Sequence, residues 1–152
     1  MITVMNICKR DVVYADREMT IDVAAKLMRT QHVVMLVVVD TREGRRVPAG
    51  LLTGHDIVIG VDALNLDAKV ITVGDLMSTE LFTVRESEEL PLVVDLMWRN
   101  GVRRVPVIGD EGELTGIVST DDLLDVFAAQ MTELAWGRDQ ASLVMPQRRW
   151  RG

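Results

Sequence analysis

Apolar residues follow two alternating rhythms along the chain, and the whole series occurs twice. Segments with apolar residues at helical spacing, such as Ala24, Leu27 and Met28 or Leu90, Val93 and Met97, are each followed by branched apolar runs of strand length. Glycine-containing turns separate those runs, at 40–44 in the first half and 109–112 in the second. The pattern therefore predicts a helix and a strand hairpin in each half of the chain.

The complete set of expected elements is the same in both halves. The expected strands are 2–4, 12–14, 33–39 and 47–52 in the first half, and 71–73, 81–84, 102–108 and 114–118 in the second. A helical turn follows each initial strand, and a closing helix begins at Gly54 or Thr120. The predicted fold class is α/β (α+β), with two tandem β-α-β-β-α repeats packed as a pseudo-symmetric pair.

The repeat is also visible residue by residue. Ile2-Thr3-Val4 recurs as Ile71-Thr72-Val73, an offset of 69 residues that is too long for a solenoid unit. The boundaries are drawn at 1–66 for the first repeat, 70–135 for the second and 138–152 for a basic C-terminal tail. Units of this size are marginal alone, so the two repeats are expected to pack on each other.

A strand-to-helix corner that carries a hydroxyl and a carboxylate occurs in both repeats. It runs from Gly116 to Asp122 with Ser119 at the join, and from Gly50 to Asp56 with Thr53 at the join. The hydroxyl is placed to cap the helix, and the carboxylate lies near the positive end of its dipole. Such a corner can attract an anion and accept hydrogen bonds from two neighbouring sugar hydroxyls. A reciprocal capping box without a ligand is the alternative.

Composition narrows the class of protein. The 152 residues are 48% hydrophobic, which suits a globular chain, but no apolar run reaches the ~20 residues of a membrane span. The N-terminus lacks the features of a signal peptide, so a cytoplasmic protein is expected. The single cysteine, Cys8, excludes an internal disulfide, and the histidines His32 and His55 show no metal-ligand spacing, so no metal site is expected.

Charge is distributed unevenly. The last fifteen residues hold four arginines and one aspartate, so they carry +3 and leave −9 on the rest of a chain whose net charge is −6. An acidic body argues against a nucleic-acid partner. The final helix keeps an apolar stripe as far as Leu134, which suits either the core or a contact with a second copy, and a homodimer is expected.

With the doubled plan and the doubled corner, the chain resembles a tandem pair of cystathionine-β-synthase (CBS) domains, or Bateman module. The likeness covers residues 1 to about 135 and is strongest in the second repeat, in Asp75-Leu76-Met77, Gly101 to Val107 and Gly116 to Asp122. The resemblance implies a regulatory module that binds AMP, ADP or ATP in clefts between the repeats and usually dimerises.

The resemblance also implies individual binding residues. The ribose-binding hydroxyl and carboxylate correspond to Ser119 and Asp122, and in the first repeat to Thr53 and Asp56. Arg103 and Arg104 match a phosphate-binding position, with Pro106 on the same strand, and the strand that lines the adenine pocket corresponds to Phe82, Thr83 and Val84. A solvated strand face is the alternative for the two arginines.

The first repeat departs from this pattern. Val34 and Met35 replace the basic pair, Val37 replaces the proline and His32 replaces the glycine, so the first site lacks those phosphate donors. Lys9 or Arg10 is a candidate substitute. The second site is therefore expected to be the stronger one.

No enzyme motif is recognisable in the sequence. A phosphate-binding G-x-x-x-x-G-K-[S/T] loop, H-E-x-x-H and G-x-S-x-G are all absent, so a non-catalytic protein without a cofactor is expected. The expected partners are an adenosine nucleotide and an unidentified protein target that is reached in trans. The alternative is a structural or partner-binding dimer that has no nucleotide ligand.

Overall fold

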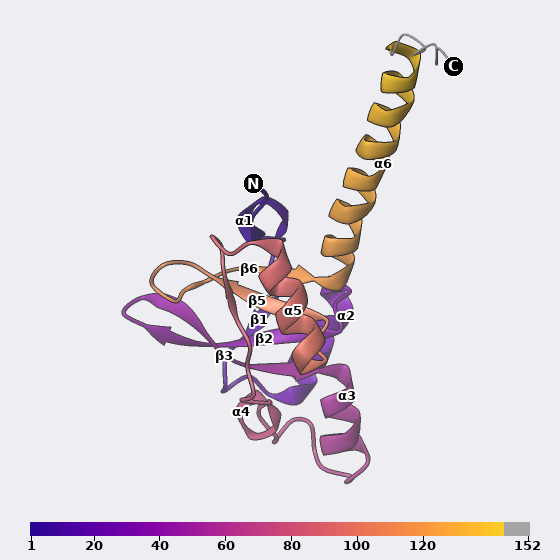
Figure 1. Cartoon of the computed structure of the whole chain (residues 1–152). Helices are drawn as coiled ribbons and strands as arrows, with labels where there is room; N and C mark the ends of the chain where they lie inside the picture. Colours follow the sequence, from indigo (N-terminus) through magenta and orange to yellow (C-terminus); the bar gives the residue numbers. More distant parts are fainter. Residues whose placement is uncertain (145–152) are drawn as a thin grey trace, which may run out of the picture.

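The computed structural model describes residues 1–144, and their side chains as far as Gly137. The first repeat contains α1 (Val4–Ile7), β1 (Tyr14–Ala15), α2 (Ile21–Gln31), β2 (Met35–Arg42), β3 (Arg45–Thr53), α3 (Gly54–Ile57) and a π-helical turn, η1 (Val58–Asp62). The second contains α4 (Val73–Leu76), β4 (Val84–Arg85), α5 (Leu90–Asn100), β5 (Arg104–Ile108), β6 (Leu114–Ser119) and α6 (Thr120–Val144). The predicted α/β (α+β) pair of repeats is confirmed (Figure 1).

Each repeat forms a three-stranded sheet with the same topology. The sheet orders are β1-β2-β3 and β4-β5-β6, in which the short first strand is parallel to its neighbour and the hairpin strands are antiparallel. Even the hairpin irregularities correspond, since the register shifts after Val38 in β2 and after Val107 in β5. The repeat seen in the sequence is therefore a repeat of backbone geometry.

The two main helices end in the same way. Gly101 ends α5 in the left-handed conformation with φ 62°, and His32 ends α2 with φ 55°. Glycine adopts this conformation without a steric penalty, whereas histidine pays a modest one. The position of the turn is conserved between the repeats even where the residue type is not.

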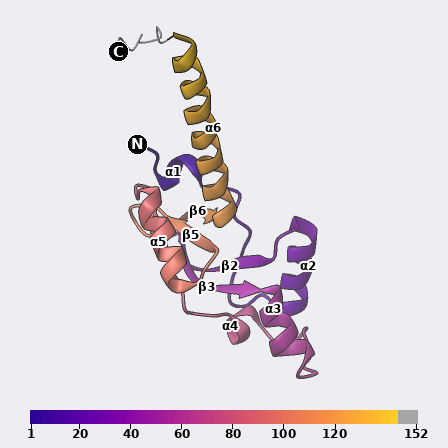
Figure 2. The same cartoon turned by 45° about the vertical axis from the view of Figure 1, so that its right-hand side comes forward.

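Each repeat receives the first helical turn of the other. Val4 of α1 is fully buried in the core that β4, α5 and β5 form, together with Val84, Val93 and Val105. Val73 of α4 is fully buried in the core of the first repeat. Figures 1 and 2 show α1 beside α6 and α4 beside α3. This exchange of segments holds the two repeats together. We call the stretches that precede β1 and β4 the exchanged segments.

The strands expected at 2–4 and 71–73 were predicted wrongly. Residues Thr3 and Thr72 form only isolated bridges, and the chain then turns into α1 and α4. The Asn6 side chain accepts a hydrogen bond from the N–H of Thr3 at 2.9 Å, and Asp75 does the same for Thr72 at 3.0 Å. These reciprocal caps favour a helical start over a continued strand.

Helix α6 leaves the body of the molecule. It packs at its base through Leu123 and Phe127, and it then projects away from the sheets as far as Val144 (Figures 1 and 2). The helix continues past residue 138, where the tail was expected to begin, and residues 145–152 lie outside the described part. Met131 and Leu134 are 72% and 77% exposed, so this part of the apolar stripe does not belong to the core.

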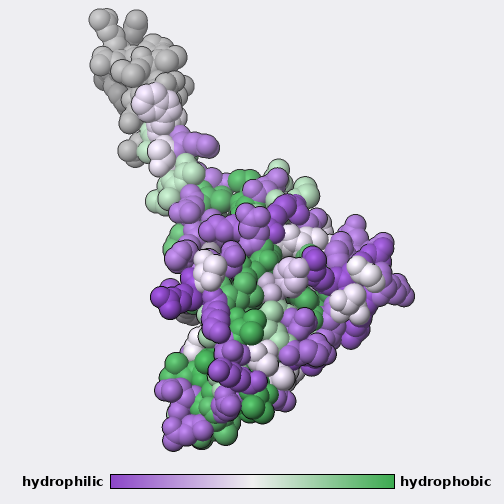
Figure 3. Space-filling view, turned by 180° about the vertical axis from the view of Figure 1, so that it is seen from behind, coloured by the Kyte–Doolittle hydropathy of each residue, from purple (hydrophilic) through white to green (hydrophobic). Residues whose placement is uncertain are grey.

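A second exposed apolar area lies at the opposite end of the molecule. Figure 3 shows hydrophobic side chains gathered there, where the exposed residues Val58, Ile59, Leu64 and Leu66 follow α3. Within residues 1–144, no helix is long and apolar enough to cross a membrane.

Candidate functional site

The corner of the second repeat is a reciprocal cap between β6 and α6. The N–H of Ser119 donates to Asp122 Oδ2 at 2.8 Å, and the N–H of Asp122 donates to Ser119 Oγ at 3.2 Å. The Asp122 side chain is only 9% exposed. Since a carboxylate has about four lone-pair sites, these contacts leave acceptor capacity for a ligand.

The corner of the first repeat has the same hydrogen bonds. The N–H of Thr53 donates to Asp56 Oδ2 at 2.9 Å, and the N–H of Asp56 donates to Thr53 Oγ1 at 3.1 Å. The capping box considered as the alternative therefore exists in both repeats. It fixes the orientation of the carboxylate and does not by itself exclude a ligand.

Lys9 reaches the corner of the second repeat from the exchanged N-terminal segment. Its backbone pairs with Ile117 through two hydrogen bonds of 2.8 and 2.9 Å, and its Nζ lies 3.7 Å from Asp122 Oδ1. The neighbouring Arg10 donates to Glu86 Oε1 at 2.9 Å. The sequence named Lys9 and Arg10 as candidate donors in place of the missing basic pair. Lys9 does line one cavity with Val34 and Met35, but on the side of the second-repeat corner, whereas Arg10 is paired with Glu86.

A cavity of about 300 Å³ opens beside Asp122, and we call it the Asp122 cavity. Lys9, Asp11, Arg104, Ser119 and Asp121 provide charged and polar groups on its walls. Val12 and Val13 of the exchanged segment and Val33 to Met35 of the first repeat provide apolar surface. The site thus combines a hydroxyl, a buried carboxylate, cations and an apolar wall that the two repeats build together.

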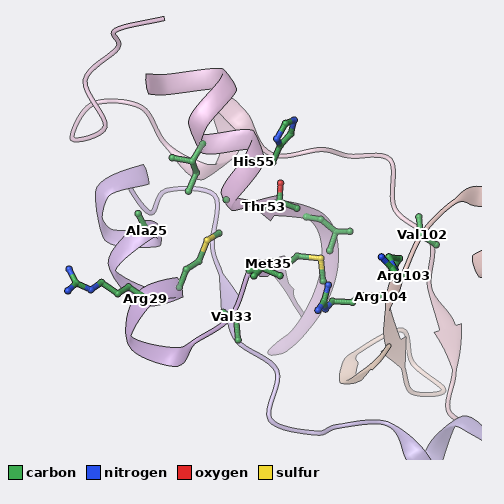
Figure 4. A pocket seen from close by; sticks show the side chains of 14 residues that line it. Ala25, Arg29, Val33, Met35, Thr53, His55, Val102, Arg103 and Arg104 are labelled. Carbon is green, nitrogen blue, oxygen red and sulfur yellow. The ribbon is translucent and has the colours of Figure 1, made fainter. Parts of the chain in front are cut away.

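A larger cavity of about 760 Å³ lies between the repeats, and we call it the central cavity (Figure 4). The first repeat lines it with Thr53, His55 and Arg29, and the second with the segment from Val102 to Arg104. No carboxylate lines this cavity among the described residues. Arg29, Arg103 and Arg104 line it among mostly apolar side chains, and such a lining suits an anionic ligand with an apolar part.

The start of β5 is fixed to the start of α6. Thr120 donates its N–H to the carbonyl of Arg103 at 2.9 Å, and its hydroxyl donates to the same oxygen at 3.3 Å. Arg104 is the strand partner of Ser119. Both arginines are exposed, and they also line a small cavity of about 190 Å³ with Ser119, Thr120 and Asp121. The structure therefore brings Arg103, Arg104, Ser119 and Asp122 together.

The remaining candidate residues lie elsewhere. Pro106 is buried within β5, and Val84 is buried in the core of the second repeat. Phe82 and Thr83 are half-buried, and they do not line the Asp122 cavity. Thr53 lines the central cavity, whereas Asp56 does not. The adenine-lining role that the resemblance implies for Phe82, Thr83 and Val84 is thus placed away from Ser119 and Asp122.

The sequence did not single out Asp11 and Arg29 as residues of these cavities, and it suggested Lys9 only for the first-repeat site. Lys9 and Asp11 precede the first repeat's main helix, and only the crossing of the chain brings them to the second corner. Arg29 lies in the last turn of α2, where a basic residue is common for reasons of helix stability alone. Neither position carries a local motif that would reveal its role.

Two further observations describe the surroundings of the corner. Among the residues the structure describes, no group of His, Cys, Asp and Glu side chains could hold a metal ion. Cys8 lies close to the corner, where burial raises the pKa of its thiol, so the thiolate that a nucleophile needs is disfavoured.

Comparison with known proteins identifies relatives of the whole arrangement. The family model for the CBS domain matches the chain at residues 4–62 and 73–129. An uncharacterized protein of Methanopyrus kandleri is 32% identical over 126 residues, which are 82% of this chain and 62% of that protein. The chain therefore spans less than two thirds of that relative's length.

Solved structures agree with this match. The CBS domain pair of protein MJ0100, in complex with 5′-methylthioadenosine and S-adenosyl-L-methionine, is 26% identical with a TM-score of 0.70, covering 86% of this chain and 98% of that chain. A hexameric CBS-CP12 protein from bloom-forming cyanobacteria is 27% identical with a TM-score of 0.71, covering 95% of this chain and 86% of that one.

Proposed function

Because the chain belongs to the CBS domain family, we propose that it is a non-catalytic regulatory module that binds an adenosine-containing ligand between its two repeats. The proposed ligand class is AMP, ADP or ATP, which acts as a regulatory ligand rather than as a cofactor. The module would act in the cytoplasm on a protein target in trans. The complex of the MJ0100 domain pair with two adenosine compounds supports the general ligand class.

One observation carries the proposal: Ser119, Asp122, Lys9 and Arg104 meet at one cavity of about 300 Å³. The carboxylate and the hydroxyl can hydrogen-bond neighbouring ribose hydroxyls, and the ammonium and guanidinium can pair with phosphate. Val12, Val13 and Met35 provide apolar surface for a base. The volume lies at the lower end of the range of small-molecule sites.

A thermal-shift panel tests the proposal. Protein that has been freed of nucleotide is melted with adenosine, AMP, ADP, ATP, NADH and S-adenosylmethionine. A ligand at 100 times its dissociation constant should add about 2.7 kcal/mol of stability, which raises the melting temperature of a chain of this size by several degrees. Unchanged melting with every compound would contradict the proposal.

The alternative function is a structural or partner-binding dimer. Its support is the projecting part of α6, where Met131, Leu134 and Trp136 are each more than half exposed. An apolar surface of this kind is typical of a protein–protein contact. The alternative predicts self-association that no nucleotide affects.

A further inference from the structure

Arg104 lines both cavities between the repeats. Its side chain is part of the wall of the Asp122 cavity and of the central cavity, and it also lines the small cavity next to Arg103. Figure 4 shows Arg104 extending from the second repeat toward Met35 of the first. One guanidinium is therefore within reach of ligands in two places.

The other cations are divided between the cavities. Arg29 and Arg103 line the central cavity but not the Asp122 cavity, and Lys9 lines the Asp122 cavity but not the central one. The wall that the first repeat gives to both cavities consists of Val33, Val34 and Met35, which carry no charge. Among the residues that line the two cavities, Arg104 is therefore the cation that anions in both would share.

Arg104 is also available to either ligand. Within residues 1–137, it forms no ion pair with a carboxylate, whereas six other basic residues do. The backbone at this point is held in place, since the preceding carbonyl of Arg103 accepts two hydrogen bonds from Thr120. The strand thus stays fixed while the side chain can turn to either side.

We infer that an anionic ligand in one cavity weakens the binding of an anionic ligand in the other, because both compete for the guanidinium of Arg104. This inference rests on the proposed function. A guanidinium that turns its donors toward a phosphate in one cavity offers fewer of them to the other cavity, and a second anion nearby meets like charge. The coupling is reciprocal, so each cavity weakens the other by the same factor.

The coupling should be about tenfold. A hydrogen bond to a charged group contributes enough to change affinity by roughly one order of magnitude, and allosteric coupling typically falls between about 5-fold and 150-fold. Uncharged adenosine does not need the guanidinium, so its binding in the two cavities should be independent. The regulatory consequence is a module that responds to its anionic ligand over a wider concentration range than a single site does.

The experiment is an AMP titration followed by methyl NMR. The side chain of Ile57 lines the central cavity and that of Ile117 the Asp122 cavity, so their methyl signals report the two occupancies separately. In the wild-type chain, the cavity that fills second should require about tenfold more AMP than it does when the other cavity is impaired. Adenosine provides the uncharged comparison.

Four variants separate the shared residue from the others. Lys9→Gln should weaken AMP only in the Asp122 cavity, and Arg29→Gln only in the central cavity, and each should relieve the remaining cavity of competition. Arg104→Gln should weaken both and abolish the dependence of one on the other. Lys26→Gln is the matched control, because Lys26 lies the same 3.7 Å from Asp22 as Lys9 lies from Asp122 but lines neither cavity.

The outcomes are distinct. If both methyl signals follow independent binding curves, or if Arg104→Gln weakens one cavity alone, the inference is wrong while the proposed function stands. If neither adenosine nor any adenine nucleotide shifts either signal, the proposed function itself fails. A tenfold separation that disappears in Arg104→Gln and with adenosine supports the inference.

Discussion

The carbonyl oxygen of Lys9 lies 2.9 Å from the position that a Cβ would take on Gly116. The Sγ of Cys8 is 3.0 Å from the same point. In the first repeat, a Cβ on Gly50 would meet the carbonyl of Ser78 even more closely. The glycine that begins each corner motif is therefore explained by the exchanged segment, which pairs with the last strand at this place.

Gly116→Ala should destabilise the protein. The added methyl group must push the paired segment away from β6, and overpacking of this kind typically costs about 1–3 kcal/mol. For a chain of ~150 residues, the melting temperature should fall by roughly 2–4 °C per kcal/mol. Scanning calorimetry measures the change.

Gly54→Ala is the matched control, because a Cβ there would meet no atom within 4 Å. Gly54 begins α3, where alanine is the better helix former, so its melting temperature should stay the same or rise slightly. Equal losses in the two variants would show that the exchanged segment does not explain the glycine.

The sequence predicted those parts of the site that lie within one repeat. The corners at Ser119 and Thr53 follow from a strand, a hydroxyl and a carboxylate that are close along the chain, so local rules identify them. Lys9 could not be assigned in this way. The position of Lys9 depends on which repeat the first segment packs against. The apolar pattern around Val4 fits the core of either repeat, so it does not show which core Val4 enters.

The same limit applies to Lys9 and Arg10. Their position near the start of the first repeat suggested that they serve its corner, but the chain crosses to the second repeat before the first sheet begins. Arg104 lies at the second-repeat corner, where the sequence placed it, but its place in the central cavity arises from packing between the repeats. Sequence order gives the elements, and the contact between repeats decides which cavity each cation serves.

Asp122→Ala should abolish AMP binding in the Asp122 cavity. The variant removes the carboxylate proposed to hold the ribose, and it also removes the cap of α6, which costs up to about 1 kcal/mol of folding stability. Calorimetric titration of variants that still melt cooperatively gives the affinity. Asp56→Ala should leave this binding intact and affect at most a weaker event, because Asp56 lines neither the Asp122 cavity nor the central cavity.

Asp75→Ala separates helix capping by an aspartate from ligand binding. Asp75 and Thr72 form the same reciprocal cap, with hydrogen bonds of 3.0 and 3.3 Å, but neither lines the Asp122 cavity or the central cavity. This variant should lose a similar amount of stability and keep its AMP affinity. If the tight binding event is lost in Asp56→Ala but not in Asp122→Ala, the assignment of Asp122 as the ribose-binding carboxylate is wrong.

The ion pair between Arg10 and Glu86 should make stability depend on pH in the acid range. The hydrogen bond from Arg10 lowers the pKa of the Glu86 carboxyl below its usual value, so the unfolded chain takes up the proton more readily than the folded one. The pair therefore contributes stability above about pH 4.3, and this contribution is lost as the pH falls through the lower pKa of the folded state.

Comparing the melting temperatures of the wild-type chain and Glu86→Gln between pH 3 and 7 tests this prediction. The wild-type chain should melt higher at pH 7, and the difference should shrink below about pH 4. Asp95→Asn is the control, because Asp95 pairs with Arg99 one turn away on the same helix and does not join two segments. A difference that grows toward low pH would contradict the sign of the effect.

The projecting part of α6 should mediate a homodimer. Met131 and Leu134 are 72% and 77% exposed, and Leu124 on the same side of the helix is 57% exposed. Isologous pairing is the commonest way for a small protein to bury such a stripe. Light scattering at micromolar concentration should give twice the mass of one chain.

Leu134→Glu places a charge in the stripe and should yield monomers, because a dimer would have to bury two unpaired carboxylates. Glu133→Gln is the control on the adjacent, exposed position, and it should remain dimeric. Removal of residues 138–152 should leave folding and AMP affinity unchanged, since the cavities and both cores lie before that point. A wild-type chain of monomer mass would contradict the dimer, and a dimer that survives Leu134→Glu would place the contact outside the projecting part of α6.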